Sequence, residues 1–130
     1  MPNEPLNVPG APAPTGPYSP AVVATGSRTI WISGQIADAP DGSVVGGDDA
    51  GEQARECLRK IDALLGAAGA SRSDVVRIGV FLTDMADRAA VASARTEYFG
   101  DHRPTATLVE VSALVAPELK VEIEAVAALT

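Results

Sequence analysis

Residues 74–83 read Asp-Val-Val-Arg-Ile-Gly-Val-Phe-Leu-Thr, and this stretch decides the fold class. In an extended chain Val75 and Phe81 share one face, and four apolar residues share the other: Val76, Ile78, Val80 and Leu82. A strand that is apolar on both faces is typical of the interior of a sheet. We therefore predict a buried central strand at these residues.

Helical patterns flank this strand on both sides. Before it, Asp49 and Glu52 form a capping box, and apolar residues then recur at intervals of three and four as far as Gly69. After it, residues 84–87 cap a second helix, which ends at Gly100. The strand therefore lies between two helices in the chain order.

The remaining apolar segments predict four further strands. Residues 21–24 and 28–36 are joined by a Gly-Ser turn and favour a β-hairpin. Residues 38–48 have the Gly, Asp and Pro content of a loop, and residues 105–112 and 120–127 are two more strands. The predicted order is ββαβαββ, an α+β fold in which two helices cover one face of a sheet.

The other face of this sheet predicts an assembly. It would carry four apolar side chains that a lone chain leaves in water: Trp31, Phe81, Leu108 and Val126. Burial of such a face requires a partner surface. The pattern therefore favours a homo-oligomer that packs through its sheets.

The length and the proline content predict one domain with an arm. At 130 residues the chain is long enough to form a single core without disulfides. Residues 1–15 are rich in proline, and each proline lacks a backbone N–H donor. We predict that this arm is flexible and forms no ladder, and that residues 16–130 form the domain.

Composition excludes several classes of function. Asp and Glu number 17 against 10 Lys and Arg, and a net charge of −7 disfavours nucleic acid, whose binding relies on basic side chains. The chain has no long apolar run and no signal-peptide pattern at its N-terminus, which predicts a cytoplasmic protein without a membrane partner. Its single cysteine and single histidine permit neither an internal disulfide nor a His/Cys metal site.

The residues that carry chemistry leave alternatives open. His102 is either a general base or a solvated side chain, and Cys57 lies on the apolar stripe of the first helix, where a thiol usually packs as a small hydrophobe. Glu110, Glu122 and Glu124 lie at alternating positions on two strands that we expect to pair. They form either a carboxylate cluster suited to acid–base catalysis or a solvated sheet edge.

Six short motifs together resemble the RidA/YjgF family of reactive intermediate deaminases. They are Gly16-Pro17-Tyr18-Ser19-Pro20-Ala21-Val22, Ile32-Ser33-Gly34-Gln35-Ile36, Gln53-Ala54, Val80-Phe81-Leu82-Thr83-Asp84-Met85, Tyr98-Phe99 and Val121-Glu122-Ile123-Glu124-Ala125. The resemblance covers about residues 14–128. It implies a chorismate-mutase-like fold, a homotrimer whose sheets form a central barrel, and three ligand clefts between neighbouring subunits.

The resemblance also implies hydrolysis of small 2-imino or 2-enamino acids to 2-oxo acids and ammonia, without a metal or an organic cofactor. An iminium carbon is already electrophilic, so the protein needs to hold the acid, place a water and manage one proton. Glu122 matches the family's water-orienting Glu and is the implied catalytic residue. Tyr18, Ser33 and Gly34 match positions that line the cleft.

The chain departs from the family at the residue that binds the substrate carboxylate. The family's Pro-Ala-Arg-Ser/Thr motif is Pro104-Thr105-Ala106-Thr107 here, so Ala106 stands in place of the arginine. Loss of this bidentate contact weakens 2-imino acid binding by about 2–5 kcal/mol if nothing replaces it. The family's Asn and Cys in this cleft correspond to Ala92 and Leu108.

Several residues offer a replacement for the missing arginine. Arg95 on the second helix and Arg103 before the motif each either restore the positive charge or face solvent. Thr105 and Thr107 instead suit a neutral or hydroxylated ligand. We therefore predict a deaminase of a small imine or enamine other than the usual 2-imino acid. The alternative is a non-catalytic trimer that binds a small ligand in the same cleft.

Overall fold

The computed structural model describes residues 3–6, 9–10 and 17–129. Its strands and helices are β1 (Asn3–Leu6), β2 (Ala21–Ala24), β3 (Arg28–Ile36), α1 (Ala50–Ala67), β4 (Val75–Leu82), α2 (Arg88–Phe99), β5 (Thr105–Glu110) and β6 (Val121–Leu129). Two short 3₁₀ turns, η1 (Arg72–Asp74) and η2 (Met85–Asp87), precede β4 and α2. Apart from β1, these elements follow the predicted order.

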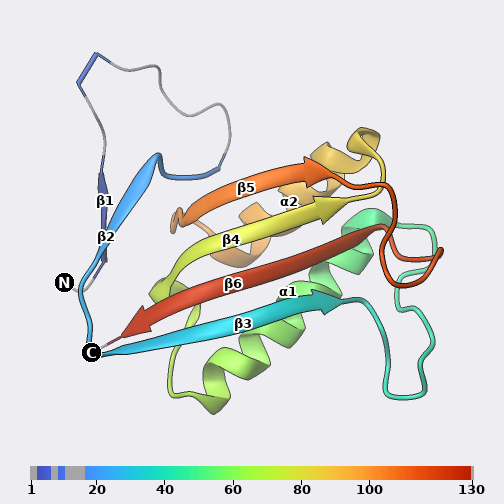
Figure 1. Ribbon diagram of the computed structural model, residues 1–130, viewed down its shortest axis with the longest axis horizontal. Coiled ribbons are helices and arrows are strands. Elements are labelled where there is room, and N and C mark those ends of the chain that lie inside the picture. Colours follow the sequence, from blue (N-terminus) through green and yellow to red (C-terminus); the bar gives the residue numbers. More distant parts are fainter. Residues whose placement is uncertain (1–2, 7–8, 11–16, 130) are drawn as a thin grey trace.

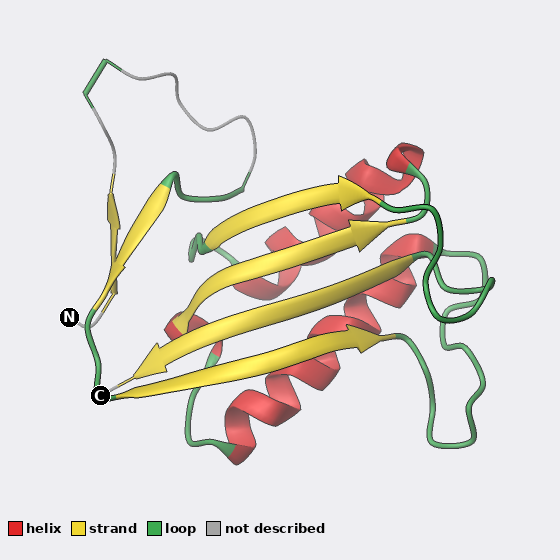
Figure 2. Cartoon of the chain, viewed as in Figure 1, coloured by secondary structure: helices red, strands yellow, loops and turns green. Residues whose placement is uncertain are grey.

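Four strands form one mixed sheet in the order β3-β6-β4-β5 (Figure 1). β6 runs antiparallel to both β3 and β4, whereas β4 and β5 are parallel. Both helices lie on the same face of this sheet, as predicted (Figure 2). The β4–α2–β5 segment is a crossover, and β5 ends the sheet on that side.

The core lies between the sheet and the helices. From Val121 to Ala127 the odd-numbered residues of β6 are buried and the even-numbered ones are partly exposed, because successive side chains point to opposite faces. The apolar stripe of α1, which includes Leu58, Ile61 and Leu65, belongs to the same core. The predicted central strand is β4, and it adds four fully buried hydrophobic residues: Val75, Ile78, Val80 and Leu82. The prediction that Val75 shares a face with Phe81 is wrong, because the pairing with β6 is irregular between Val75 and Arg77.

The opposite face of the sheet is apolar in part. Trp31 is 78% exposed there, and Phe81 and Val126 are half-buried. The prediction that Leu108 lies on this face is wrong. Leu108 is in register with Val80 on β4, whose side chain is buried, so it packs against the core from the helix side.

Two predictions about the N-terminal strands, the hairpin and the arm without a ladder, are wrong (Figure 1). β2 pairs with β1 in a separate antiparallel ribbon and does not form a hairpin with β3. The predicted arm at residues 1–15 therefore does contain a ladder, in which Pro5 is tolerated because both strands of a two-stranded ribbon are edges. Asn3 Nδ2 donates to the carbonyl of Ala128 at 3.2 Å and ties the ribbon to the end of β6. Most other residues of the arm lie outside the described ranges.

The helices begin and end at the predicted caps, with one shift. Asp49 Oδ1 accepts the Glu52 backbone N–H at 3.0 Å and starts α1. Asp84 caps η2 rather than α2, which begins one turn later at Arg88 and ends at Gly100, where φ is +61°. Neither helix in the described part of the chain is long and apolar enough to cross a bilayer.

Gln53 joins α1 to two loops. Its side chain is fully buried, and its Nε2 donates to the carbonyl oxygens of Gly47 at 2.7 Å and Glu118 at 3.0 Å. Its Oε1 accepts the backbone N–H of Lys120 at 2.8 Å. One amide thus positions the loop before α1 and the loop that leads into β6.

We predict that Gln53→Leu lowers the free energy of unfolding by about 2–4 kcal/mol, because the buried Gln53 amide makes hydrogen bonds to three partly buried backbone groups, which all lose this partner. Urea unfolding at fixed protein concentration measures the change. Gln35→Leu is the matched control, since among the described residues the Gln35 side chain bonds only to the carbonyl of Ser33 in its own strand. Equal stabilities of the two variants would contradict this role of Gln53.

Candidate functional site

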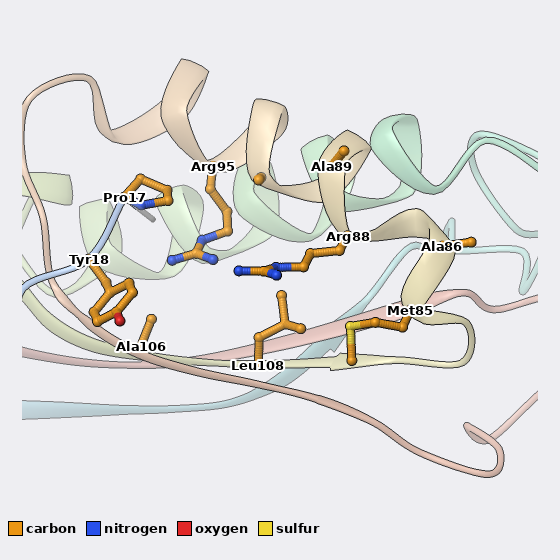
Figure 3. Close-up of a pocket in the computed structure, with 10 residues that line it drawn as sticks. Pro17, Tyr18, Met85, Ala86, Arg88, Ala89, Arg95, Ala106 and Leu108 are labelled. Carbon is orange, nitrogen blue, oxygen red and sulfur yellow. The ribbon is translucent and has the colours of Figure 1, made fainter. Parts of the chain in front are cut away.

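A cavity of about 790 Å³ lies between α2 and the edge strand β5 (Figure 3). Small side chains leave this space unfilled, namely Ala89 and Ala92 on α2 and Ala106 on β5. Arg88 and Arg95 extend into it from α2. The other lining residues are Pro17, Tyr18, Met85, Ala86 and Leu108.

Four predicted site residues meet in this cavity, although they are far apart in the sequence. Ser19 explains how Tyr18 reaches it: its backbone N–H donates to the Pro104 carbonyl at 3.1 Å, and its hydroxyl donates to the Arg103 carbonyl. These bonds fix Tyr18 beside Ala106 (Figure 3). Arg95 and Leu108 complete the set.

The predicted catalytic residue lies elsewhere in the chain. Glu122 is paired in register with Phe81 on β4, and its half-buried side chain is on the sheet face opposite the helices. A bulge in β3 places Gly34 under it, where a Cβ would come within 2.7 Å of Glu122 Cδ. Ser33 lies on the same face and lines a shallow pocket with Trp31. One chain therefore does not bring Glu122, Ser33 and Gly34 together with the cavity.

Two further predicted binding residues are outside the cavity. Thr107 is exposed on β5, between the cavity-lining residues Ala106 and Leu108. Arg103 lines a separate pocket of about 320 Å³, and Tyr18 lines this pocket too. Of the two arginines proposed to replace the family's arginine, only Arg95 lines the cavity.

The predicted cluster of three carboxylates is divided between the two faces. Glu110 accepts the Met85 backbone N–H at 2.8 Å and so lies on the helix side. Glu124 and Glu122 share the outer face, where Glu124 forms an ion pair with Arg77 at 3.0 Å. Within the described residues, Glu122 forms no ion pair.

His102 and Cys57 are structural residues. His102 Nε2 lies 2.7 Å from the Val75 carbonyl, which requires that Nε2 carry the proton and donate it. His102 is thus bound to the backbone and is not a solvated side chain. Cys57 is fully buried, and burial raises the pKa of its thiol to about 12, so no thiolate forms near neutral pH.

Sequence reasoning missed Arg88, although a signal for it exists. Arg88 and Arg95 are seven residues apart on α2, which places them on the same helix face two turns apart. Arg95 is only 6% exposed, and the pKa of its guanidinium is lowered by burial and by the positive charge of Arg88. The cavity thus contains two cationic side chains.

Comparison with known proteins gives consistent matches. The family model described as Endoribonuclease L-PSP matches residues 9–129. The 3-aminoacrylate deaminase RutC of Acinetobacter baylyi is 37% identical, over 98% of this chain and 98% of that protein. The human 2-iminobutanoate/2-iminopropanoate deaminase is 40% identical, over 90% of this chain and 83% of that protein. A crystal structure of the Rid-family protein YyfB from Yersinia pestis is 34% identical with a TM-score of 0.89, covering 99% of this chain and 100% of that chain.

We predict that Cys57 does not react with Ellman's reagent in the native protein near neutral pH, because its thiol is buried and protonated. The same protein in concentrated guanidinium chloride supplies the control, and it should release one equivalent of thiol per chain. Rapid reaction of the native protein would contradict the assignment of Cys57 as a buried, structural residue.

Proposed function

Because this chain belongs to the RidA/YjgF family, we propose that it is a hydrolytic deaminase that releases ammonia and a carbonyl product from a small enamine or imine. The names of two relatives, a 3-aminoacrylate deaminase and a 2-iminobutanoate/2-iminopropanoate deaminase, support this reaction class. The observation that carries the proposal is the Glu122 carboxylate, held over Gly34 without an ion-pair partner in the described residues. Such a carboxylate suits a general base.

The proposed reaction of an iminium ion needs one base and one water, and an enamine first takes up a proton from solvent at its carbon to become that iminium ion. Glu122 takes a proton from the water as its oxygen bonds to the iminium carbon, which gives a tetrahedral amino alcohol. The proton then passes to the amino nitrogen, the C–N bond breaks, and ammonia leaves. Loss of the hydroxyl proton completes the carbonyl product. This scheme uses no metal and no organic cofactor.

We further propose a homotrimer, in which the cavity of one subunit faces Glu122 of the next. The two parts lie on different faces of a single chain, so a substrate in the cavity reaches a Glu122 only on another subunit. The exposed Trp31 and the half-buried Phe81 and Val126 support an assembly through the outer sheet face. We propose no nucleic-acid partner, because the net charge is −7.

The lining of the cavity favours a substrate other than the usual 2-imino acid. The resemblance places a carboxylate-binding arginine on β5 at the position of Ala106, and this side chain has no charge. The same small and apolar lining at Ala92, Ala106 and Leu108 favours a second candidate function, a non-catalytic protein that binds a small ligand. Turnover of an imine or enamine distinguishes the deaminase from the binding protein, because only the deaminase releases ammonia.

We predict that Glu122→Gln lowers kcat by about 10²–10⁴-fold, because the amide cannot accept the proton from water. The assay follows ammonia release from 3-aminoacrylate and from 2-iminobutanoate, the compounds in the names of the two relatives. Glu124→Gln is the matched control, since Glu124 lies on the same strand and face but is paired with Arg77.

Unchanged turnover in Glu122→Gln would remove Glu122 from the mechanism. Wild-type protein that accelerates hydrolysis neither of these two compounds nor of other small imines and enamines, yet binds a small ligand in the cavity, would favour the binding-protein alternative.

We predict that mixed assemblies recover activity. Glu122→Gln lacks the base, and Leu108→Trp fills the cavity, so each variant alone is inactive. After subunit exchange in an equal mixture, about one quarter of the clefts combine an intact cavity with an intact Glu122. The measurement is ammonia release before and after exchange. No recovery, although native mass spectrometry shows mixed trimers, would contradict a site shared between subunits.

A further inference from the structure

Arg95 is the one buried charged side chain in the described part of the chain, and its partners are incomplete. The other two buried polar side chains are satisfied, Gln53 by three hydrogen bonds and Ser19 by the Arg103 carbonyl. Among the described residues, by contrast, the Nε and Nη2 of Arg95 have no hydrogen-bond partner. A buried charge without partners destabilises a fold strongly. The presence of such a charge here indicates a bound ligand that supplies the missing hydrogen-bond partners.

The unpartnered nitrogens have the chemistry of a carboxylate site. Nε and Nη2 are neighbours on the planar guanidinium, and their N–H groups together match the two oxygens of a carboxylate. The Arg95 side chain extends from α2 into the cavity, toward Tyr18 and Ala106 (Figure 3). Arg95 therefore lies on the wall of the cavity, but its Nε and Nη2 are covered by neighbouring atoms, so a carboxylate reaches them only after this side chain turns toward the open space.

Arg88 adds a second positive charge to the same space. Figure 3 shows its guanidinium group pointing toward that of Arg95, above Leu108. Neither arginine forms an ion pair with any residue in the described ranges. Arg88 is also the first residue of α2, where the helix dipole disfavours a cation. Two unpaired cations that share one cavity are stabilised by an anion between them.

The opposite wall of the cavity allows this arrangement. Ala106 on β5 and Ala92 on α2 are small, so the arginine side chains from α2 reach across to the strand. A bulky or basic residue at 106 would occupy the same volume. In this chain the positive charge of the cavity therefore comes from α2 and not from β5.

We propose that Arg95 and Arg88 form the carboxylate-binding element of this chain, so that its substrate is a small imine or enamine with a carboxylate, anchored from α2 and not from β5. The carboxylate assignment rests on the cavity alone, and only its application to a substrate rests on the proposed function. Arg95 is the primary contact, and Arg88 adds electrostatic attraction.

The test is calorimetric titration of the full chain with propionate and with propanamide, its neutral counterpart of similar shape. We expect wild-type protein to bind propionate and not propanamide. Arg95→Met should weaken propionate binding at least 10-fold, and Arg88→Met should weaken it less. Arg103→Met should leave it unchanged, because Arg103 does not line the cavity. Equal binding by wild type and Arg95→Met, or a loss only in Arg103→Met, would overturn the proposal.

Two further measurements separate a binding role from a structural one. Without ligand, Arg95→Met should raise Tm, because it removes a buried charge that lacks partners. A lower Tm would mean that Arg95 supports the fold instead. Arg95→Met combined with Ala106→Arg should recover propionate binding, since it moves the charge to the opposite wall. Preference of the wild type for inorganic phosphate over propionate would overturn the carboxylate assignment.

Binding of propionate does not depend on turnover. The proposed carboxylate site and the proposed deaminase reaction can therefore each be contradicted without the other. Wild-type protein that binds propionate through Arg95 but releases no ammonia from any imine would leave the anion site in place and remove the deaminase. Ammonia release that is unaffected by Arg95→Met would keep the deaminase and remove Arg95 from substrate binding.

Discussion

The alternation of side chains along β6 is the constraint on which the rest of the structure depends. β6 pairs with β3 on one side and with β4 on the other, so its two faces set the two faces of the whole sheet. Its odd-numbered residues pack under the helices, and Glu122 and Glu124 are left on the outer face. A shift of one residue would bury both carboxylates and expose the core. The position of the proposed base thus follows from burial.

Residues with small side chains or none leave the space for both parts of the candidate site. Gly34 lies under the Glu122 carboxylate because a Cβ there would overlap it, and the β3 bulge supplies this close approach. Across the sheet, Ala92 and Ala106 leave the space that Arg88 and Arg95 enter. In each case a small residue makes room for a charged one. The charges of the site and its empty volume are therefore linked, and a substitution at either kind of position affects both.

Local patterns predicted most of the elements but not all of their partners. The Asp49 side-chain cap and the glycine at 100 were predicted correctly, because caps depend on a few neighbouring residues. The second half of the predicted capping box is absent, since the Asp49 backbone N–H donates to the Gly46 carbonyl and the Glu52 carboxylate accepts from Arg55. The prediction of a hairpin at residues 21–36 was wrong, because β2 pairs with a strand in the proline-rich arm. Leu108 was assigned to the wrong face, since the face of an edge strand depends on its register with β4.

The sequence alone was sufficient for the order of the elements from β2 onward, the start of α1, the end of α2, the central position of β4 and the candidates Glu122 and Arg95. These depend on periodicity, on turn chemistry and on motifs, all of which are local. Only the tertiary structure decided that Arg95, and not Arg103, enters the cavity, that Arg88 joins it, and that Glu122 faces away from both. The physical reason is that pairing register and burial arise from contacts between residues far apart in the chain, and no local pattern records them.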